Sequence, residues 1–272
     1  MASSPTRPLI TITCDFGIVS QGVGVMQAVA YGINPDANVV HFTPEVPAFD
    51  IRAGARVMEG LATIQVGFHV CVVDPGVGTK RQAIIIETGR GDFLVGPDNG
   101  VLIPATGFLG GIKTIVSAEN EKYMKTPMSD VFHGRDIFTP AAAWLSTGVP
   151  IKDFGPELKV TDLVPAPYGE ATVTDGRIDA MIIYANNYGS SFLNIKADQL
   201  QKAGFSQGDE LILSINNKRI KIPLLRTFGQ VPVGDPLLFP DDYGRVEIAI
   251  NQGDAKKTYG INIGDDVILE KA

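Results

Sequence analysis

The chain has 272 residues, of which 44% are hydrophobic and 19% charged, with 30 glycines and 18 prolines. This composition is typical of a folded protein rich in turns and excludes a disordered or coiled-coil chain. The length allows one large domain or two modest ones, and we expect two. The net charge is −7 and the basic residues never run beyond adjacent pairs, which argues against nucleic acid as a partner.

The first half of the chain alternates predicted strands and helices, in the order that builds an α/β domain. Residues 83–87 and 92–96 flank a Gly-Arg-Gly turn, which predicts a hairpin and therefore a mixed sheet. Pro140 lies near the start of the last helix, where a missing N–H costs little. The expected elements are strands at 9–13, 39–42 and 68–73, a helix through 25–31 that ends near Gly32, and helices at 50–61 and 137–145.

The second half changes character. Between Thr161 and Glu170 the chain carries two prolines and a glycine without periodic pattern, so we predict a first domain over 1–165 and a second over 171–272. The second domain is predicted to be all β, a small antiparallel barrel or sandwich. Its short strands are expected at 177–184, 191–195, 210–215, 219–224, 245–250 and 266–270.

The sequence gives no sign of targeting or membrane insertion. Met1 to Pro8 is short and polar, and the apolar run after it is interrupted by Asp15, so no signal peptide is evident. No stretch approaches the roughly 18 uninterrupted apolar residues of a membrane span. We therefore expect a cytoplasmic protein with no membrane partner.

Ionisable side chains occur directly after or beside apolar runs at two places, where a strand should end and a pocket can form. The strand at 68–73 delivers Asp74 to its carboxyl edge, and the Pro-Gly-Val-Gly turn leaves the backbone open to a ligand, with Arg81 close behind. His133 lies in the second stretch, Phe132 to Asp136. Taken alone, Asp74 is more often a turn former and Arg81 more often a surface charge, and His133 could be an interior histidine.

Asp15 follows the first strand, at the kind of edge where α/β sheets bind ligands. Its carboxylate can accept both hydrogen bonds of a ribose diol, or it can cap the next helix. Cys14 and Cys71 lie in apolar runs, and we interpret them as small buried residues without chemistry. Arg135 and Asp136 are interpreted as structural.

Four motifs come in an order and spacing that resemble the S-adenosyl-L-methionine hydroxide adenosyltransferases, a family related to the fluorinases and chlorinases. Two segments of the second half, Tyr188-Gly189-Ser190 with Asn194-Ile195, and residues 244–249, are more loosely similar. The four motifs are Asp15-Phe16-Gly17, Asp74-Pro75-Gly76-Val77-Gly78 with Arg81, Gly96-Pro97-Asp98-Asn99-Gly100, and Phe132-His133-Gly134-Arg135-Asp136 with Pro140-Ala141-Ala142.

The resemblance implies an α/β domain followed by a β-barrel domain, assembled as a homotrimer whose active sites lie between one subunit's first domain and its neighbour's second. It implies that water attacks C5′ of S-adenosyl-L-methionine and gives adenosine and L-methionine, with no metal or organic cofactor. Asp74, Arg81 and His133 would be the catalytic residues that handle the water. The implied substrate-binding residues are Asp15 at the ribose, Phe49, Tyr188 and Phe228 against the adenosyl group, and Asn99, Ser190 and Asp242.

The chain also departs from the family pattern. Ser190 stands where the family usually has an Asn, and Asp242 stands where a Ser would lie near the methionine carboxylate, which an Asp repels unless it is protonated or pairs with the amino group. Residues 18–22 lack the acidic and aromatic residues usual after Asp-Phe-Gly. His133 and Gly134 replace a Tyr and a Ser of the fluorinases, which weakens one alternative, a halide-dependent adenosyl transferase. The other alternative is a non-catalytic adenosyl- or nucleoside-binding protein.

Overall fold

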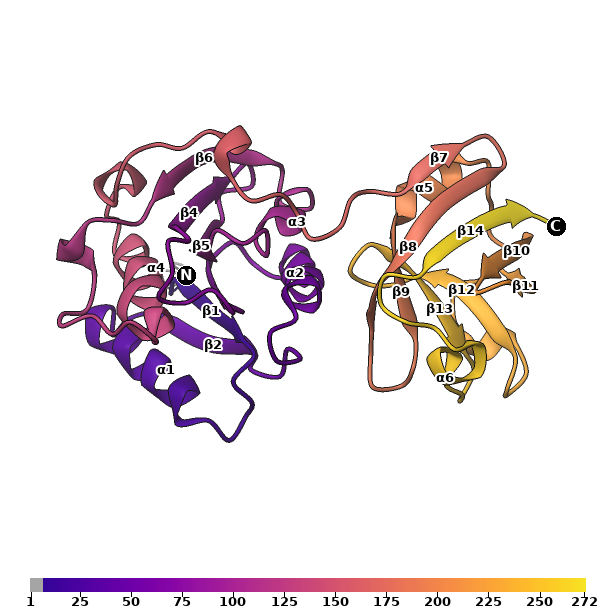
Figure 1. Cartoon of the computed structure of the whole chain (residues 1–272), viewed down its shortest axis with the longest axis horizontal. Coiled ribbons are helices and arrows are strands. Elements are labelled where there is room, and N and C mark those ends of the chain that lie inside the picture. Colours follow the sequence, from indigo (N-terminus) through magenta and orange to yellow (C-terminus); the bar gives the residue numbers. More distant parts are fainter. Residues whose placement is uncertain (1–6) are drawn as a thin grey trace, which may run out of the picture. The chain divides into compact units, whose positions relative to one another are not determined.

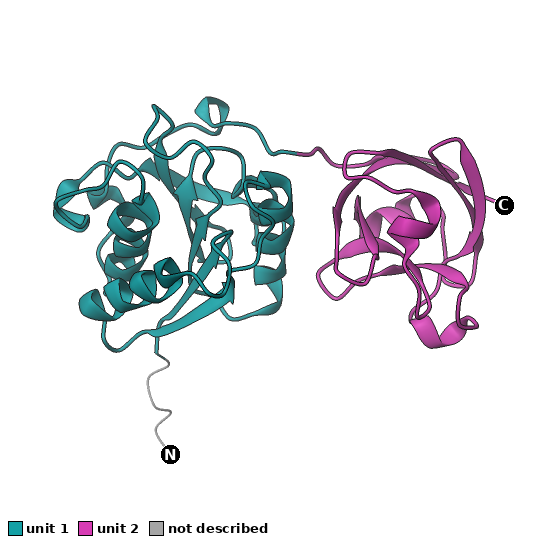
Figure 2. Ribbon diagram, turned by 60° about the horizontal axis from the view of Figure 1, so that its bottom comes forward, with its two compact units in different colours: residues 1–167 teal, residues 168–272 magenta. Residues whose placement is uncertain are grey.

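The computed structural model describes residues 7–272, and the chain divides into two compact units, one ending at Pro167 and the other spanning Tyr168–Ala272 (Figure 2). The expected lack of a signal peptide concerns mainly residues 1–6, which lie outside the described residues. Within residues 7–272, none of the helices combines the length and apolar character needed to cross a membrane.

A six-stranded mixed sheet forms the centre of the first unit (Figure 1). Its order is β2-β1-β3-β5-β4-β6; β1 pairs in parallel with β2 and β3, and β3 with β5, whereas β4 runs antiparallel to β5 and β6. The predicted mixed sheet and hairpin are confirmed, and β6 is a strand that we did not predict. The strands are β1 (Leu9–Cys14), β2 (Asn38–Thr43), β3 (Phe68–Val72), β4 (Ala83–Thr88), β5 (Phe93–Pro97) and β6 (Ile112–Ser117).

Helices cover both faces of this sheet (Figure 2). Helix α1 (Gln21–Ile33) packs against α4 (Thr139–Ser146), and α2 (Ile51–Glu59) packs against α3 (Ile103–Thr106). The last predicted helix begins two residues late because a π-helical turn, Gly134–Phe138, precedes α4. Short 3-10 turns occupy Gly60–Thr63, Glu121–Tyr123, Ile151–Asp153, Val160–Asp162 and Phe228–Gln230.

The strands of the second unit form a nearly closed, barrel-shaped antiparallel sheet (Figure 2), as predicted. Its order is β11-β10-β14-β8-β9-β13-β12, with β7 paired to β8, and two short helices, α5 (Ala197–Lys202) and α6 (Ala255–Tyr259), accompany it. The strands are β7 (Thr172–Thr174), β8 (Arg177–Ala185), β9 (Ser191–Lys196), β10 (Glu210–Ile215), β11 (Lys218–Pro223), β12 (Pro236–Pro240), β13 (Arg245–Ile250) and β14 (Asp266–Lys271).

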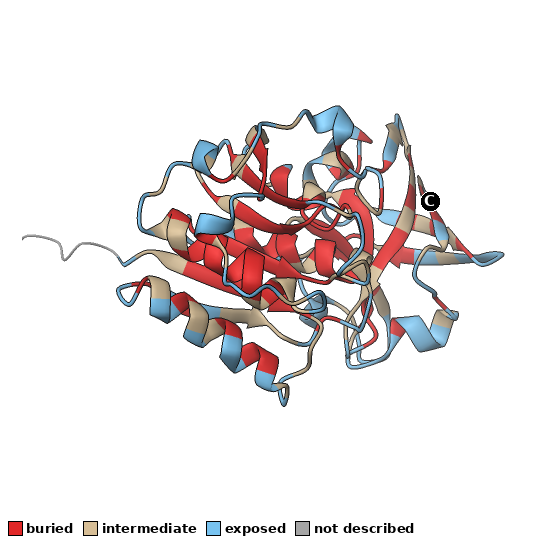
Figure 3. Cartoon of the chain, turned by 60° about the vertical axis from the view of Figure 1, so that its left-hand side comes forward, coloured by how far each residue is buried: buried red, intermediate tan, exposed pale blue. Residues whose placement is uncertain are grey.

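Burial is concentrated in the strands and in the helix faces turned toward them (Figure 3). Cys14 and Cys71 are free and buried, as predicted. Burial raises the pKa of the Cys14 thiol to about 11 and raises the pKa of Cys71 as well, so both thiols stay protonated and unreactive at neutral pH.

A buried polar network ties three elements of the first unit together. The Thr11 hydroxyl donates to His69 Nδ1 at 2.8 Å, and His69 Nε2 donates to Asp92 at 3.0 Å. Arg90 donates to Asp92 at 2.7 Å and to three backbone carbonyls that follow α2. Burial lowers the pKa of His69, so its ring is neutral. Despite its hydroxyl–imidazole–carboxylate order, the network is structural because His69 and Asp92 are fully buried.

Candidate active site

Strand topology brings two acidic residues to one edge of the sheet. In the parallel pair β1 and β3, Cys14 lies opposite Val72, so the residues that follow these strands leave the sheet at the same carboxyl edge. Asp15 comes directly after β1, and Asp74 comes two residues after the end of β3. Both side chains line one cavity of about 310 Å³, which we call the front cavity. Most of its remaining wall is apolar, and His133 is its third ionisable residue.

The three predicted catalytic residues are in contact. Arg81 Nε donates to both Asp74 oxygens, at 3.0 and 2.9 Å, and Nη2 donates to Asp74 Oδ2 as well. The same Nη2 lies 2.7 Å from His133 Nδ1. The Arg81 side chain is only 10% exposed and that of Asp74 only 4%. A charge-assisted pair at this burial holds both groups in one geometry.

These contacts fix the tautomer of His133. A guanidinium has no acceptor, so His133 Nδ1 must accept the hydrogen bond from Arg81. Burial lowers the pKa of His133, and the neighbouring Arg81 cation lowers it further, so the ring is neutral at pH 7. A neutral ring that is unprotonated at Nδ1 carries its hydrogen on Nε2. His133 therefore offers a water molecule an N–H donor.

Two motif glycines allow the segments around the array to approach one another. A Cβ on Gly134 would lie 2.9 Å from a methyl carbon of Val72 and 3.0 Å from the sulfur of Met26. A Cβ on Gly78, which has a φ of +74°, would lie 2.4 Å from the backbone oxygen of Asp130. The π-helical turn that begins directly after His133 can therefore pack against β3 only because residue 134 has no side chain.

Asp15 is held in place from one side. Its Oδ2 accepts the backbone N–H of Phe49 at 2.8 Å, and Phe49 adopts a left-handed φ of +64°. A left-handed conformation at a bulky residue is uncommon and marks a constrained site. The Phe49 ring is 73% exposed and lines the front cavity. The structure thus brings Asp15 and Phe49 to the same cavity as Asp74 and His133.

Asn99 is not among the residues that line the front cavity. Its amide donates to the backbone oxygen of Val73 at 2.9 Å, and its side-chain oxygen accepts the N–H of Val101 at 3.1 Å. Asn99 therefore braces the backbone directly before Asp74. Asp136 has a similar supporting place, because it accepts hydrogen bonds from the Arg135 side chain and from the N–H of Ser129.

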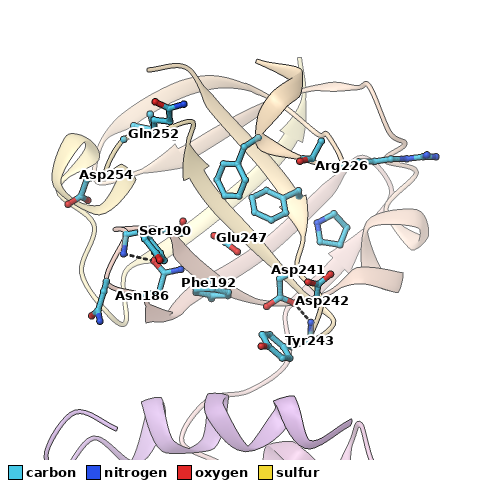
Figure 4. A pocket seen from close by; sticks show the side chains of 18 residues that line it. Asn186, Ser190, Phe192, Arg226, Asp241, Asp242, Tyr243, Glu247, Gln252 and Asp254 are labelled. Carbon is cyan, nitrogen blue, oxygen red and sulfur yellow. Dashed lines mark hydrogen bonds between the residues drawn. The ribbon is translucent and has the colours of Figure 1, made fainter. Parts of the chain in front are cut away.

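The second unit gathers the remaining candidates around a cavity of about 1040 Å³, which we call the barrel cavity (Figure 4). Tyr188, Ser190, Phe228 and Asp242 all line it. Tyr188 is 82% exposed, so its ring is free to pack on a ligand.

Sequence reasoning missed several polar residues of the barrel cavity, among them Asn186, Arg226, Asp241 and Glu247. Asp241 illustrates the reason. Its side chain accepts hydrogen bonds from the N–H groups of Tyr243 and Arg245, and the sequence around it is that of an ordinary turn, which does not indicate a ligand site. Among residues 7–272, Arg226 is the sole Lys or Arg in the lining, against four acidic residues, Asp241, Asp242, Glu247 and Asp254. This wall favours a ligand that carries positive charge.

An α/β unit with a buried Asp–Arg–His array at its strand ends, followed by a β-barrel unit, defines a two-domain enzyme architecture. The family model for the SAM hydroxide adenosyltransferase N-terminal domain matches residues 10–155, and the model for the C-terminal domain matches residues 180–268. The chain therefore belongs to the SAM hydroxide adenosyltransferase family, as its motifs indicate.

Similar proteins match this chain along nearly its whole length. A protein of Salinispora tropica named (R)-S-adenosyl-L-methionine hydrolase is 35% identical, over 96% of this chain and 97% of its own. One of the same name from Thermus thermophilus is 31% identical, over 97% and 99%. A fluorinase of Actinoplanes is 22% identical over 98% of both chains. The crystal structure of an uncharacterized conserved protein from Thermotoga maritima has a TM-score of 0.89 at 32% identity, covering 96% of this chain and all of the other.

Proposed function

We propose that the protein hydrolyses S-adenosyl-L-methionine to adenosine and L-methionine by attack of water on C5′. The observation that carries this proposal is the contiguous Asp74–Arg81–His133 array at the wall of a cavity that also contains Asp15. The 35% identity to a relative named (R)-S-adenosyl-L-methionine hydrolase supports it.

The difficult part of this reaction is the activation of the water nucleophile. The leaving group is a neutral thioether, which departs without an acid, whereas water is a poor nucleophile at neutral pH. Arg81 supplies positive charge and the neutral His133 supplies an Nε2–H donor, and together they favour hydroxide character in a water held beside them. Asp74 fixes the guanidinium through its bidentate pair and so orients the donors. When hydroxide meets a sulfonium the charges cancel, and a dry, apolar cavity favours that step.

The sugar end is assigned to Asp15. Its Oδ2 accepts the Phe49 N–H, and its Oδ1 accepts no hydrogen bond within residues 7–272 and is open to the ribose diol. Phe49, Tyr188 and Phe228 would pack on the adenosyl group, with Ser190 at the adenine end and Asp242 at the methionine end of the substrate. Asn99 supports the site by holding the backbone before Asp74 and makes no contact with the substrate. No metal or organic cofactor takes part in the proposed step.

We further propose a cytoplasmic homotrimer in which the barrel cavity of one subunit completes the front cavity of its neighbour. The support is that the aromatic candidates divide between the two cavities, Phe49 in the front and Tyr188 and Phe228 in the barrel. Ultracentrifugation tests the trimer. Mixing inactive His133→Ala and Tyr188→Ala subunits tests the shared site, because mixed oligomers regain activity only if the two residues act from different chains.

One incubation separates the proposed function from both alternatives. The purified protein is given S-adenosyl-L-methionine with and without fluoride or chloride, and the nucleosides are followed by chromatography. Adenosine formed without halide supports the hydrolase. A 5′-halogenated nucleoside that appears only with halide would mark a halide-dependent transferase, and binding without any product would mark a non-catalytic binding protein.

A further inference from the structure

His133 lines two cavities. Besides the front cavity, it lines one of about 300 Å³, which we call the rear cavity. Asp74 lines the front cavity and Arg81 lines the rear one. Since Arg81 is bonded to both Asp74 and His133, the three catalytic candidates form a partition between the two cavities.

The partition is supported by an aromatic ring. The Arg81 guanidinium lies 5.1 Å from the centroid of the Phe138 ring, and the His133 ring meets Phe138 edge to face at 6.5 Å. Phe138 is fully buried and belongs to the π-helical turn that begins at Gly134. The buried ring thus supports the Arg81 and His133 side chains from a side that the front cavity does not reach.

The rear cavity differs from the front one in the polarity of its wall. The exposed side chains of Lys80, Glu119 and Glu121 line it, so water enters it readily. Ser117 also lines it, and the buried Ser117 hydroxyl has no hydrogen-bond partner within residues 7–272. A buried hydroxyl of this kind is normally satisfied by an ordered water.

We propose that the rear cavity is the route by which water reaches the catalytic array, and by which the released proton leaves it, while the substrate fills the front cavity. This inference rests on the proposed hydrolase function. In each turnover an O–C5′ bond forms, the C5′–S bond breaks with its electron pair moving to sulfur, and one proton of the attacking water passes to water in the rear cavity. Adenosyl bound in the small, largely apolar front cavity blocks that side, so water and proton need another path.

A bulky residue in the rear cavity tests the route without altering the array. Met128 lines the cavity and is 46% exposed, so the larger ring of Met128→Trp can occupy the cavity without displacing buried core residues. We expect kcat to fall roughly tenfold while the affinity for adenosine is unchanged. The exposed Gln82, also in the lining, provides a second variant, Gln82→Trp. Val66→Trp is the matched control, since Val66 is 47% exposed and lines neither cavity, and its kcat should equal that of the wild type.

A second readout does not depend on turnover. Hydrogen–deuterium exchange at the ring C2 atoms of the three histidines reports how freely solvent reaches each of them. With saturating adenosine as the probe, His133 should still exchange in the wild type and should be protected in Met128→Trp. Full protection by adenosine in the wild type, or unchanged kcat in both tryptophan variants, would overturn the rear route while leaving the hydrolase intact. A wild type that neither binds adenosine nor forms it would instead refute the proposed function, and this route with it.

Discussion

Gly134→Ala should slow hydrolysis by displacing His133, although residue 134 itself carries no chemistry. The new Cβ would lie 2.9 Å from a methyl carbon of Val72 and 3.0 Å from the sulfur of Met26, where an ordinary contact needs at least 3.4 Å. The thioether of Met26 can rotate away, but Val72 is β-branched and fixed in β3. The π-helical turn must therefore move by about half an ångström, which an overpacked site resists at a cost of about 1–3 kcal/mol.

The movement acts on the contact between His133 and Arg81. That contact is 2.7 Å long, and lengthening it by half an ångström places it at the weak end of the hydrogen-bond range. A loss of about 1.4 kcal/mol of transition-state stabilisation lowers kcat roughly tenfold. The KM should change less, because Asp15 and Phe49 lie on other segments of the chain.

Steady-state kinetics of adenosine release and urea denaturation measure the two effects of Gly134→Ala. Gly32→Ala is the matched control, because Gly32 is also helical and a Cβ there meets nothing within 4 Å. The control should keep wild-type kcat and gain about 0.5–1 kcal/mol of stability. If Gly134→Ala retains wild-type kcat, the close approach of the turn to β3 does not position His133.

The remaining predictions concern the array, the ribose contact and the buried network. Arg81→Ala and His133→Ala should each lower kcat by roughly 100-fold or more with little change in substrate Kd, and equal losses in rate and affinity would make them binding residues. Asp15→Ala should do the reverse and raise KM through the lost diol contacts; unchanged adenosine binding by calorimetry would contradict its role. The pKa of His133 lies below 6.5, so kcat should be constant at neutral pH and fall only below pH 6.5, where protonation of Nδ1 removes the acceptor for Arg81. A pH profile of kcat that already falls as the pH drops toward 6.5 would contradict the neutral ring. Asp92→Asn should cost about 3 kcal/mol in urea denaturation by weakening a buried ion pair. Burial favours the protonated form of Asp92, but hydrogen bonds from His69 and Arg90 outweigh it and hold the pKa of Asp92 far below 3.8. The stability that the Asp92 carboxylate contributes is therefore present above pH 3.8 and is lost as the pH falls further. An Asp92→Asn variant with wild-type stability at pH 7 would refute this contribution.

The elements that place the array were predictable because their patterns are unambiguous. The strands β1 and β3 are mainly apolar, with Thr11 and Thr13 in β1 and His69 in β3 as their polar residues. An aspartate follows each strand within two residues, and parallel neighbours of this kind end at one edge of a sheet. A resemblance in four motifs then singled out Asp15, Asp74, Arg81 and His133, which the structure brings to one place.

Three strands, β6, β7 and β12, escaped prediction for identifiable reasons. β7 is only three residues long, too short to show a pattern. In β6 the exposed Lys113 interrupts the apolar run, and only its last residues are buried, so neither alternation nor a continuous run is visible. β12 begins and ends with proline, which argues against a strand in sequence alone. Proline is tolerated there because β12 is the last strand in the sheet order, and on the side away from β13 it makes only an isolated bridge at Leu238 rather than a ladder.

The supporting contacts of the site depend on tertiary structure and could not be predicted. Nothing in the loop 96–100 indicates that Asn99 turns toward the Val73 carbonyl rather than toward a ligand. The rear cavity is likewise invisible in sequence, since its wall combines the end of β6 with segments around Lys80 and Met128 that are far apart in the chain.

The motif glycines and the ionisable residues act together to set the geometry of the array. Gly78 lets the turn after Asp74 touch the backbone of Asp130, and Gly134 lets the turn after His133 touch β3. These two close backbone contacts bring the segments of Asp74 and His133 together. Arg81 can hydrogen-bond to both residues only while both contacts are maintained. The donors are thus set by backbone packing before any substrate arrives, which is the preorganisation that water activation without reorganisation requires. Substitutions at these glycines should therefore lower kcat, as substitutions of Arg81 or His133 do, rather than only lower stability.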